Sequence, residues 1–325
     1  MNLFHDKKIY SIGQYYMYDY IIYHKNCIDG FSGFFILALT NTISSSATIY
    51  PDVPSTNTIP PNINNKNVIC IDVAYKPFII EQIFERANSV VFIDHHDSLK
   101  DDIKKIKQKY KNNPKKKIIF DIRYSGVGLT WKLFHPKKPF PLFVKYIQDN
   151  DIGAWKIQKT IPFINALQVK YKLDTSQQNI NKWKLLFNKK EIDRLVLIGQ
   201  IYDEYKMFLL MQNVKRNSVL KFPSKKLLAL FPKTQMKEKQ YNVAVTNSSC
   251  PNVSMLGKSM VDTIDCDFAF LWSLNIDRNE YVVSLRSKKT DVGKVASYFN
   301  GGGHVGASAF SISANKISVS DMFDK

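Results

Sequence analysis

Three short apolar runs in the first third of the chain are each followed directly by a residue type that binds metal ions. The runs and the residues after them are 20–23 before His24, 68–71 before Asp72, and 89–93 before Asp94, His95 and His96. Runs of this length, rich in Ile, Val, Tyr and Phe, are typical of buried β-strands. The carboxyl ends of parallel strands line one crevice of an open α/β sheet, and ligands bind there. The pattern therefore predicts a parallel sheet with a metal site along one edge.

The segment from about 19 to 151 alternates strand patterns with helix patterns. Helical patterns follow the first two apolar runs, and the expected helices cover 31–39 and 77–87. A further strand is expected over 118–121. This alternation implies a parallel sheet with helices on its faces, because that is the arrangement that βαβ connections produce. The fold class is therefore α/β.

A second unit is predicted beyond a long helical pattern over 191–214. The basic segment 218–240 has no clear periodicity, so we expect it to be irregular. Further strand patterns indicate a smaller α/β unit, and they lie over 243–245, 268–272 and 281–285. The predicted division of the chain is an N-terminal domain over 1–188, a connecting helix and linker over 189–240, and a C-terminal domain over 241–325.

The chain carries 46 Lys and Arg against 28 Asp and Glu, which gives a formal charge of +18. Such a charge favours an anionic partner, for example nucleic acid or a phosphorylated metabolite. The sequence is also crowded with Lys, Asn and Ile, which AT-rich codons encode, so a drift in composition accounts for the charge equally well. The charge alone therefore does not identify the partner.

The location of the protein is expected to be cytoplasmic, without membrane contact. No apolar stretch approaches the ~20 residues of a membrane span, and residues 1–19 lack the apolar core of a secretory signal. The four cysteines form no disulfide framework in the sequence pattern.

The strand-end residues belong to a coherent set of metal ligands, namely His24, Asp29, Asp72, His95 and a later aspartate near residue 150. Carboxylate and imidazole ligands together suit Mn²⁺, Zn²⁺, Fe²⁺ or Co²⁺, and sets rich in oxygen also accept Mg²⁺. Several carboxylates in one crevice repel each other unless cations are present. Two divalent ions would relieve this repulsion and would also activate water for phosphoryl displacement.

These motifs resemble those of the DHH phosphoesterase superfamily, in particular the NrnB-type oligoribonucleases that carry a C-terminal DHHA1 domain. The segment 23–31 resembles the first motif of that subgroup, and Asp72 matches its second. Asp94-His95-His96 matches the third motif, which gives the family its name, and 148–151 resembles the fourth. The resemblance covers nearly all of the chain beyond residue 19.

The resemblance implies a role for each motif residue, with His24, Asp29, Asp72, His95 and Asp149 as ligands of two metal ions. It implies Mn²⁺ as the usual ion, with Mg²⁺ or Co²⁺ as alternatives, and Asp72 as the bridging ligand. Asp94 would orient His95 through its ring N–H, and His96 would contact the scissile phosphate or protonate the leaving oxygen. Asp151 is the alternative to Asp149, although the sequence favours a cap or turn role for it.

Cys27 departs from the Asp that many relatives have in the first motif. A neutral thiol is a poor ligand for Mg²⁺ or Mn²⁺, although the NrnB-type subgroup also has Cys at this place. Packing at the base of the following helix is an equally good interpretation of Cys27.

The C-terminal region carries the sequence Gly301-Gly302-Gly303-His304, with Arg286 upstream. Glycines let the backbone approach a ligand closely, and their N–H groups can hold phosphate. With Arg286 these residues resemble the DHHA1 signature, which implies that they bind substrate and that Arg286 contacts a phosphate. A plain loop and a surface arginine are the structural alternatives.

The implied function is a hydrolase that trims short single-stranded RNA or DNA from the 3′ end to mononucleotides. The same family includes enzymes that act on small nucleotides such as cyclic dinucleotides or phosphoadenosine phosphate. A non-catalytic nucleic-acid-binding relative is the third alternative, which the retained motif residues oppose. The motifs do not determine the oligomeric state.

Overall fold

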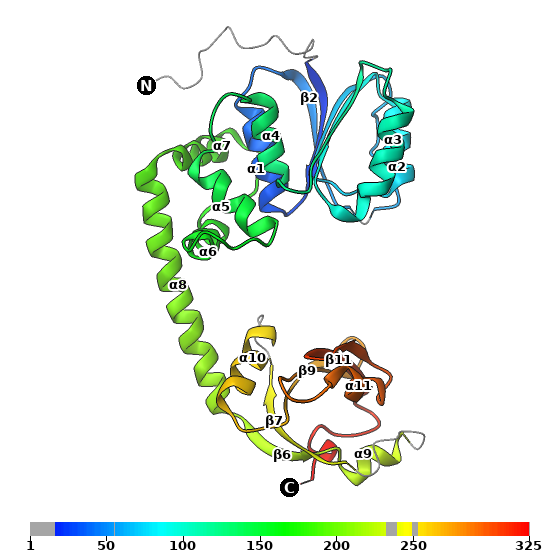
Figure 1. The fold of residues 1–325 in the computed structure, drawn as a ribbon, viewed down its shortest axis with the longest axis vertical. Coiled ribbons are helices and arrows are strands. Elements are labelled where there is room, and N and C mark those ends of the chain that lie inside the picture. Colours follow the sequence, from blue (N-terminus) through cyan, green and yellow to red (C-terminus); the bar gives the residue numbers. More distant parts are fainter. Residues whose placement is uncertain (1–16, 55, 232–238, 249–252, 325) are drawn as a thin grey trace. The chain divides into compact units, whose positions relative to one another are not determined.

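The protein is an α/β protein with two compact units, Met1–Asp203 and Glu204–Lys325 (Figure 1). The computed structural model describes residues 17–54, 56–231, 239–248 and 253–324. Most of the tyrosine-rich start of the chain, to which the sequence assigns no role, lies outside these residues. Each unit has its own sheet, and each is described separately.

The first unit contains a sheet of five parallel strands in the order β2-β1-β3-β4-β5. The strands are β1 (Tyr18–His24), β2 (Ile43–Asp52), β3 (Asn67–Ile71), β4 (Ser89–Asp94) and β5 (Lys116–Phe120). The chain places β2 on one side of β1 and β3 on the other, so the direction of winding reverses at β1. In open α/β sheets such a reversal creates a crevice at the carboxyl ends of the strands.

Helices cover both faces of this sheet, as the βαβ alternation predicted (Figure 1). One face is covered by α1 (Ile28–Ala38), α4 (Gly126–Phe134) and α5 (Leu142–Asp151), and the other by α2 (Pro77–Arg86) and α3 (Lys100–Lys109). Neighbouring residues of β1 enter opposite cores, since Ile21 packs with the first set of helices and Ile22 with the second. This double burial explains why the strand is an unbroken apolar run.

Strand register brings the three predicted strand ends together. Tyr23 of β1 pairs with Ile71 of β3, and Ile71 pairs with Ile93 of β4. The residues that follow these three positions therefore lie side by side at one edge of the sheet.

The long helix α8 (Lys189–Lys215) confirms the helical pattern over 191–214. Its first part packs in the first unit with α6 (Thr160–Lys170) and follows α7 (Gln177–Trp183). Gly199 is the point of closest approach, because a Cβ there would lie 1.7 Å from the carbonyl oxygen of Pro162. The two helix backbones can meet only if this position has no side chain.

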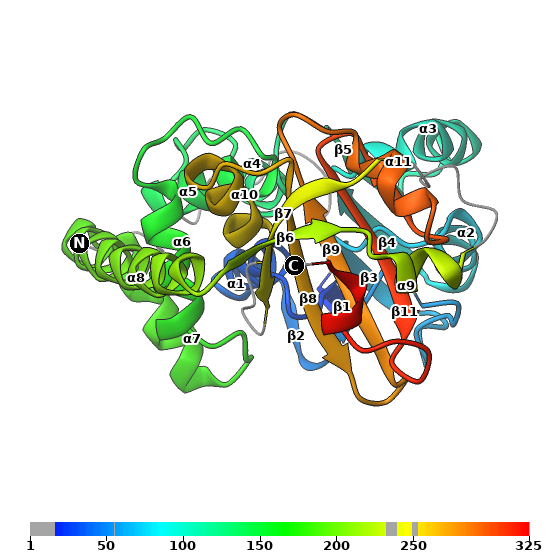
Figure 2. The same cartoon turned by 90° about the horizontal axis from the view of Figure 1, so that it is seen from below.

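The second unit contains a six-stranded mixed sheet in the order β10-β11-β9-β8-β7-β6. Its strands are β6 (Ser218–Phe222), β7 (Tyr241–Asn247), β8 (Phe268–Asn275), β9 (Glu280–Arg286), β10 (Gly302–His304) and β11 (Ala307–Ser313). Only β7 and β8 pair in parallel among these strands. Figure 2 shows α10 (Val253–Thr263) and α11 (Val292–Ser297) on opposite sides of this sheet.

The expectation of irregular structure over 218–240 is wrong at its beginning. Ser218–Phe222 forms the edge strand β6, which pairs antiparallel with β7, and α9 (Lys225–Ala229) follows it. Phe222 is fully buried in the core of the second unit. A five-residue edge strand with one buried face carries too few apolar residues to stand out in the sequence.

Among the residues that the structure describes, no helix combines the length and the apolar composition needed to cross a membrane.

The Gly199→Ala substitution is expected to lower the free energy of unfolding of the first unit by about 1–3 kcal/mol, the usual cost of overpacking. Ala is otherwise the better helix former, so Gln200→Ala, at the exposed position next to it, should be neutral or slightly stabilising. Urea unfolding followed by circular dichroism measures both. Equal stabilities of the two variants would contradict the close packing of α6 and α8.

Candidate metal centre

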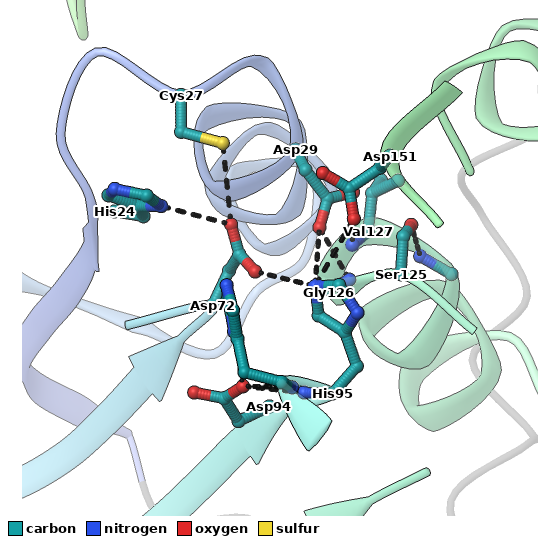
Figure 3. A network of polar contacts seen from close by, with 12 residues as sticks. His24, Cys27, Asp29, Asp72, Asp94, His95, Ser125, Gly126, Val127 and Asp151 are labelled. Carbon is teal, nitrogen blue, oxygen red and sulfur yellow. Dashed lines mark hydrogen bonds and ion pairs between the residues drawn. The ribbon is translucent and has the colours of Figure 1, made fainter. Parts of the chain in front are cut away.

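The imidazole of His95 lies at the centre of a cluster of carboxylates at the carboxyl edge of the first sheet (Figure 3). Its Nε2 lies 3.1 Å from Oδ1 of Asp72, 3.2 Å from Oδ2 of Asp151 and 3.9 Å from Oδ2 of Asp29. His95 follows β4, Asp72 follows β3, and Asp29 lies in the first turn of α1. Asp151 is the last residue of α5. The cluster therefore draws its residues from four separate segments of the first unit.

Asp72 connects the two halves of the cluster. Its Oδ1 faces His95, while its Oδ2 lies 3.5 Å from Nδ1 of His24 and 3.5 Å from Sγ of Cys27. Its backbone has a positive φ of 63°, a conformation that Asp tolerates better than most residues. This turn directly after β3 directs the carboxylate, which is only 1% exposed, into the cluster.

Asp29 is held in place by the amino end of α4. Its Oδ2 accepts a hydrogen bond of 2.5 Å from the N–H of Gly126, and its Oδ1 accepts one of 3.0 Å from the N–H of Val127. A Cβ on Gly126 would lie 2.7 Å from Oδ2 of Asp29 and 2.7 Å from Cβ of Asp72. A glycine is therefore required where α4 begins, because the helix end touches both carboxylate residues.

Asp94 orients His96 and not the ring of His95, which corrects the role implied by the family resemblance. Oδ1 of Asp94 accepts hydrogen bonds from the backbone N–H groups of His95 and His96, at 2.6 and 2.9 Å. The same atom lies 2.7 Å from Nδ1 of His96. The buried carboxylate thus shapes the turn after β4 and fixes the ring of His96, whose side chain is 34% exposed.

Asp149 is not part of the cluster, so Asp151 replaces it in the predicted ligand set. The carboxylate of Asp149 accepts hydrogen bonds from the backbone N–H groups of Lys156 and Ile157 and from the hydroxyl of Thr160. Asp149 and Asp151 lie in the last turn of α5, where two residues at this spacing point in different directions. The cap or turn role that the sequence favoured for Asp151 is filled by Asp149.

The crowding of the carboxylates disturbs their protonation. Burial, followed by the charges of Asp72 and Asp151, raises the pKa of Asp29 well above its usual value. Burial and the charge of Asp72 raise the pKa of Asp151 to about 6. Burial also opposes ionisation of Asp72, but its imidazole neighbours outweigh that effect and lower its pKa to about 2.

The two histidines of the third motif respond in the opposite sense. Burial opposes a charge on His95, but its hydrogen bond to Asp72 and the other carboxylates outweigh this and raise the pKa of His95 to about 9. The bond to Asp94 raises the pKa of His96.

The residues fit a divalent cation. Three overlapping sets have ligand atoms within 4.8 Å of one another, and together they comprise His24, Cys27, Asp29, Asp72, His95, His96 and Asp151. Nδ1 of His24 is buried without a hydrogen-bond partner and lies next to Asp72, as a ligand atom would. Carboxylates with imidazoles are a set that Mn²⁺, Fe²⁺, Co²⁺ and Zn²⁺ accept.

Cys27 contributes less to this set than its neighbours. Burial and the nearby Asp72 raise the pKa of its thiol, and a protonated thiol is a weak ligand. Its Sγ instead donates a long hydrogen bond to Oδ2 of Asp72. Cys27 therefore both precedes the first turn of α1 and borders the cluster, so the two interpretations of this residue are compatible.

The predicted substrate-binding residues lie in the second unit. Arg286 on β9 and His304 on β10 both pair with Ala307 of β11. Residues in one such row point to the same face of a sheet, so the two side chains share a face. Nη2 of Arg286 donates a 2.8 Å hydrogen bond to the hydroxyl of Ser254 at the beginning of α10.

The triple glycine forms the start of an edge strand and not a free loop. Gly302–His304 is the strand β10, and a Cβ on Gly301 would lie 2.2 Å from the carbonyl oxygen of Ala309. Gly303 has a φ of 145°, and Gly302 has open space beside it. Close backbone contact therefore explains Gly301 and Gly303, whereas Gly302 is free to approach a ligand.

Comparisons with known proteins give distant similarities. No family model matches the chain. The uncharacterized protein R106 of Acanthamoeba polyphaga mimivirus is 27% identical over 313 residues, which cover 92% of this chain and 68% of that protein. The solved pGpG-specific phosphodiesterase PggH of Vibrio cholerae is 14% identical with a TM-score of 0.47, covering 91% of this chain and 94% of its own.

An exopolyphosphatase-related protein from Bacteroides fragilis is also 14% identical, with a TM-score of 0.34, covering 89% of this chain and 85% of its own. Similarities at this level do not carry a functional argument.

Asp149→Asn and Asp151→Asn are expected to have opposite effects. Asp149→Asn should cost about 2 kcal/mol of stability, since it removes charge-assisted hydrogen bonds, while Mn²⁺ still binds. Asp151→Asn should leave stability equal or higher, because a repelling charge is removed, and should weaken Mn²⁺ binding roughly tenfold or more. Thermal unfolding and calorimetric titration with Mn²⁺ measure the two properties. Weaker Mn²⁺ binding in Asp149→Asn alone would restore the original ligand set.

The contribution of Asp149 to stability is expected to depend on pH. Its hydrogen bonds to Thr160 and to the loop outweigh burial and lower the pKa of its carboxyl. A lowered folded-state pKa adds stability that is present above the unfolded value near 3.8 and is lost as the pH falls through the folded value. The stability difference between wild type and Asp149→Asn should therefore shrink below about pH 4. A constant difference down to pH 2 would contradict these contacts.

Proposed function

We propose that the protein is a metal-dependent phosphoesterase of the DHH type that hydrolyses phosphodiester bonds of short oligonucleotides. One observation carries the proposal: three carboxylates and two imidazoles converge at the carboxyl edge of a parallel sheet, with His96 beside them. The motif residues that supply this cluster are those in which the sequence resembles DHH phosphoesterases.

The cluster has the parts that phosphodiester hydrolysis needs. Divalent cations bound there would lower the pKa of a water molecule and stabilise charge on the phosphoryl oxygens. His96 is suited to be the complementary acid, because Asp94 holds its Nδ1 and raises its pKa, which favours the protonated imidazole. Its partial exposure lets the other ring nitrogen reach the leaving oxygen of a substrate.

The proposed substrate class follows from the resemblance to NrnB-type oligoribonucleases and from the charge of +18. Arg286 and His304 on one face of the second sheet are suited to hold a phosphate. Small nucleotides such as cyclic dinucleotides or phosphoadenosine phosphate need the same chemistry, so they are the second substrate class to test. Mn²⁺ is the proposed ion.

Hydrolysis of a 5′-labelled pentaribonucleotide in Mn²⁺ is expected to give a ladder that shortens from the 3′ end. EDTA should abolish the reaction, because the bound cations are proposed to activate the attacking water. His96→Gln should lower kcat roughly 10²- to 10⁴-fold, the usual contribution of an acid catalyst, and leave Mn²⁺ binding intact. Asp101→Asn, at an exposed position of α3, is the matched control and should retain full activity.

The outcomes separate the candidate substrates. An intact pentamer together with hydrolysis of a cyclic dinucleotide or of phosphoadenosine phosphate would transfer the proposal to small nucleotides. Inertness towards all of these with Mn²⁺ bound would refute the proposal. RNA binding by such an inert protein would indicate a non-catalytic nucleic-acid-binding relative.

A further inference from the structure

Trp155 is displayed on the surface of the first unit in an unusual backbone conformation. Its side chain is 65% exposed, although large aromatic residues are normally mostly buried. Its φ is +44°, a left-handed conformation that is a true outlier for a bulky residue. Strain of this kind persists only where the surrounding structure enforces it, and it is concentrated at functional sites.

The structure enforces this conformation through Asp149. The backbone carbonyl of Asp149 accepts hydrogen bonds from the N–H groups of Ala154 and Trp155, at 3.1 and 3.2 Å. Its carboxylate accepts from Lys156 and Ile157, the next two residues. One aspartate therefore binds four consecutive N–H groups, which curls residues 152–157 into a compact loop with the indole of Trp155 outside it.

This loop begins at the metal centre. Asp151, whose Oδ2 lies 3.2 Å from Nε2 of His95, is separated from Asp149 by one residue. Because Trp155 hydrogen-bonds to Asp149, its backbone lies within about three residue lengths, roughly 10 Å, of the backbone of Asp151. A nucleobase next to a phosphate held at the centre would lie at a comparable distance from Asp151.

We infer that Trp155 is a stacking platform for the nucleobase next to the scissile phosphate. Base–aromatic stacking accepts every base because each has a π-face, and the backbone that carries the exposed indole is held by the hydrogen bond to Asp149. The exposed Lys156 beside it adds a positive charge for the phosphate backbone. This inference rests on the proposed function and narrows its substrate class to phosphoesters that carry a base, excluding pyrophosphate and polyphosphate.

The decisive comparison uses two 5′-labelled pentamers, one of adenosine nucleotides and one of 1-deoxyribose phosphates without bases. Trp155→Gly is the main variant, since Gly accepts the positive φ without strain and the loop should keep its shape. It should raise the KM for the adenosine pentamer roughly 5- to 150-fold, as expected for one lost base stack, and leave the base-free pentamer unchanged. Trp155→Phe should recover most of the affinity.

Phe78→Ala is the matched control, because Phe78 is also an exposed aromatic residue, 51% exposed, but belongs to α2 on the opposite face of the sheet. It should change neither substrate. Equal hydrolysis of the adenosine pentamer by wild type and Trp155→Gly would overturn the stacking role and leave the proposed function standing. An equal loss on both pentamers would also overturn it, since that would indicate damage to the centre.

A binding measurement tests Trp155 independently of catalysis. Trp131 and Trp183 are buried, at 6% and 0% exposure, and Trp272 of the second unit is partly buried. In a Trp272→Phe background, acrylamide quenching of tryptophan fluorescence therefore reports mainly on the exposed Trp155. AMP should protect the fluorescence of the Mn²⁺-loaded protein from acrylamide, whereas ribose 5-phosphate, which lacks the base, should not. If neither pentamer is hydrolysed, the proposed function fails, and this comparison alone decides the base-binding role. Equal effects of the two ligands would refute it.

Discussion

The crowding of three carboxylates around one imidazole nitrogen is the constraint on which the first unit depends. Asp29 and Asp72 are each 1% exposed, so water cannot screen them. Two like charges about 4 Å apart repel by about 4 kcal/mol even at an effective dielectric constant of 20. Burial and this repulsion raise the pKa of Asp29, and the neighbouring carboxylates raise the pKa of His95. A divalent cation would offset the repulsion between the carboxylates, so their crowding favours metal binding.

The scaffold around the centre is built to hold these charges close together. The register of β1, β3 and β4 places their last residues side by side, but the strand ends alone do not orient the side chains that follow. The left-handed turn at Asp72 orients its carboxylate, and the N–H groups at the start of α4 orient that of Asp29. Gly126 is the point at which both devices meet, since no side chain fits between α4 and the two aspartates. The close approach of the carboxylates therefore depends on backbone positions that the sequence marks only by small or polar residues.

The parallel sheet, and the meeting of four of the five residues proposed as metal ligands, could be predicted because each depends on local pattern. Apolar runs of strand length, each ending in His or Asp, predict both a sheet and the edge at which the residues meet. The choice between Asp149 and Asp151 could not be made in this way. It depends on the loop after α5, which folds back so that the N–H groups of residues 154–157 donate hydrogen bonds to Asp149. The partner of Asp94 depends likewise on the geometry of one turn. β6 was missed because an edge strand with few buried residues has little periodic signal.

Asp149 and Asp151 show how two identical side chains in one helix turn come to different uses. At the end of α5, Asp151 faces the sheet edge and Asp149 faces the loop that leaves the helix. Asp151 lies next to His95, where the charge of its carboxylate is unfavourable without a cation. Asp149 accepts hydrogen bonds from backbone N–H groups, which stabilise the charge of its carboxylate. The hydrogen bonds of Asp149 thus fix the chain immediately beyond the centre. They also stabilise the strained backbone of Trp155, close to Asp151.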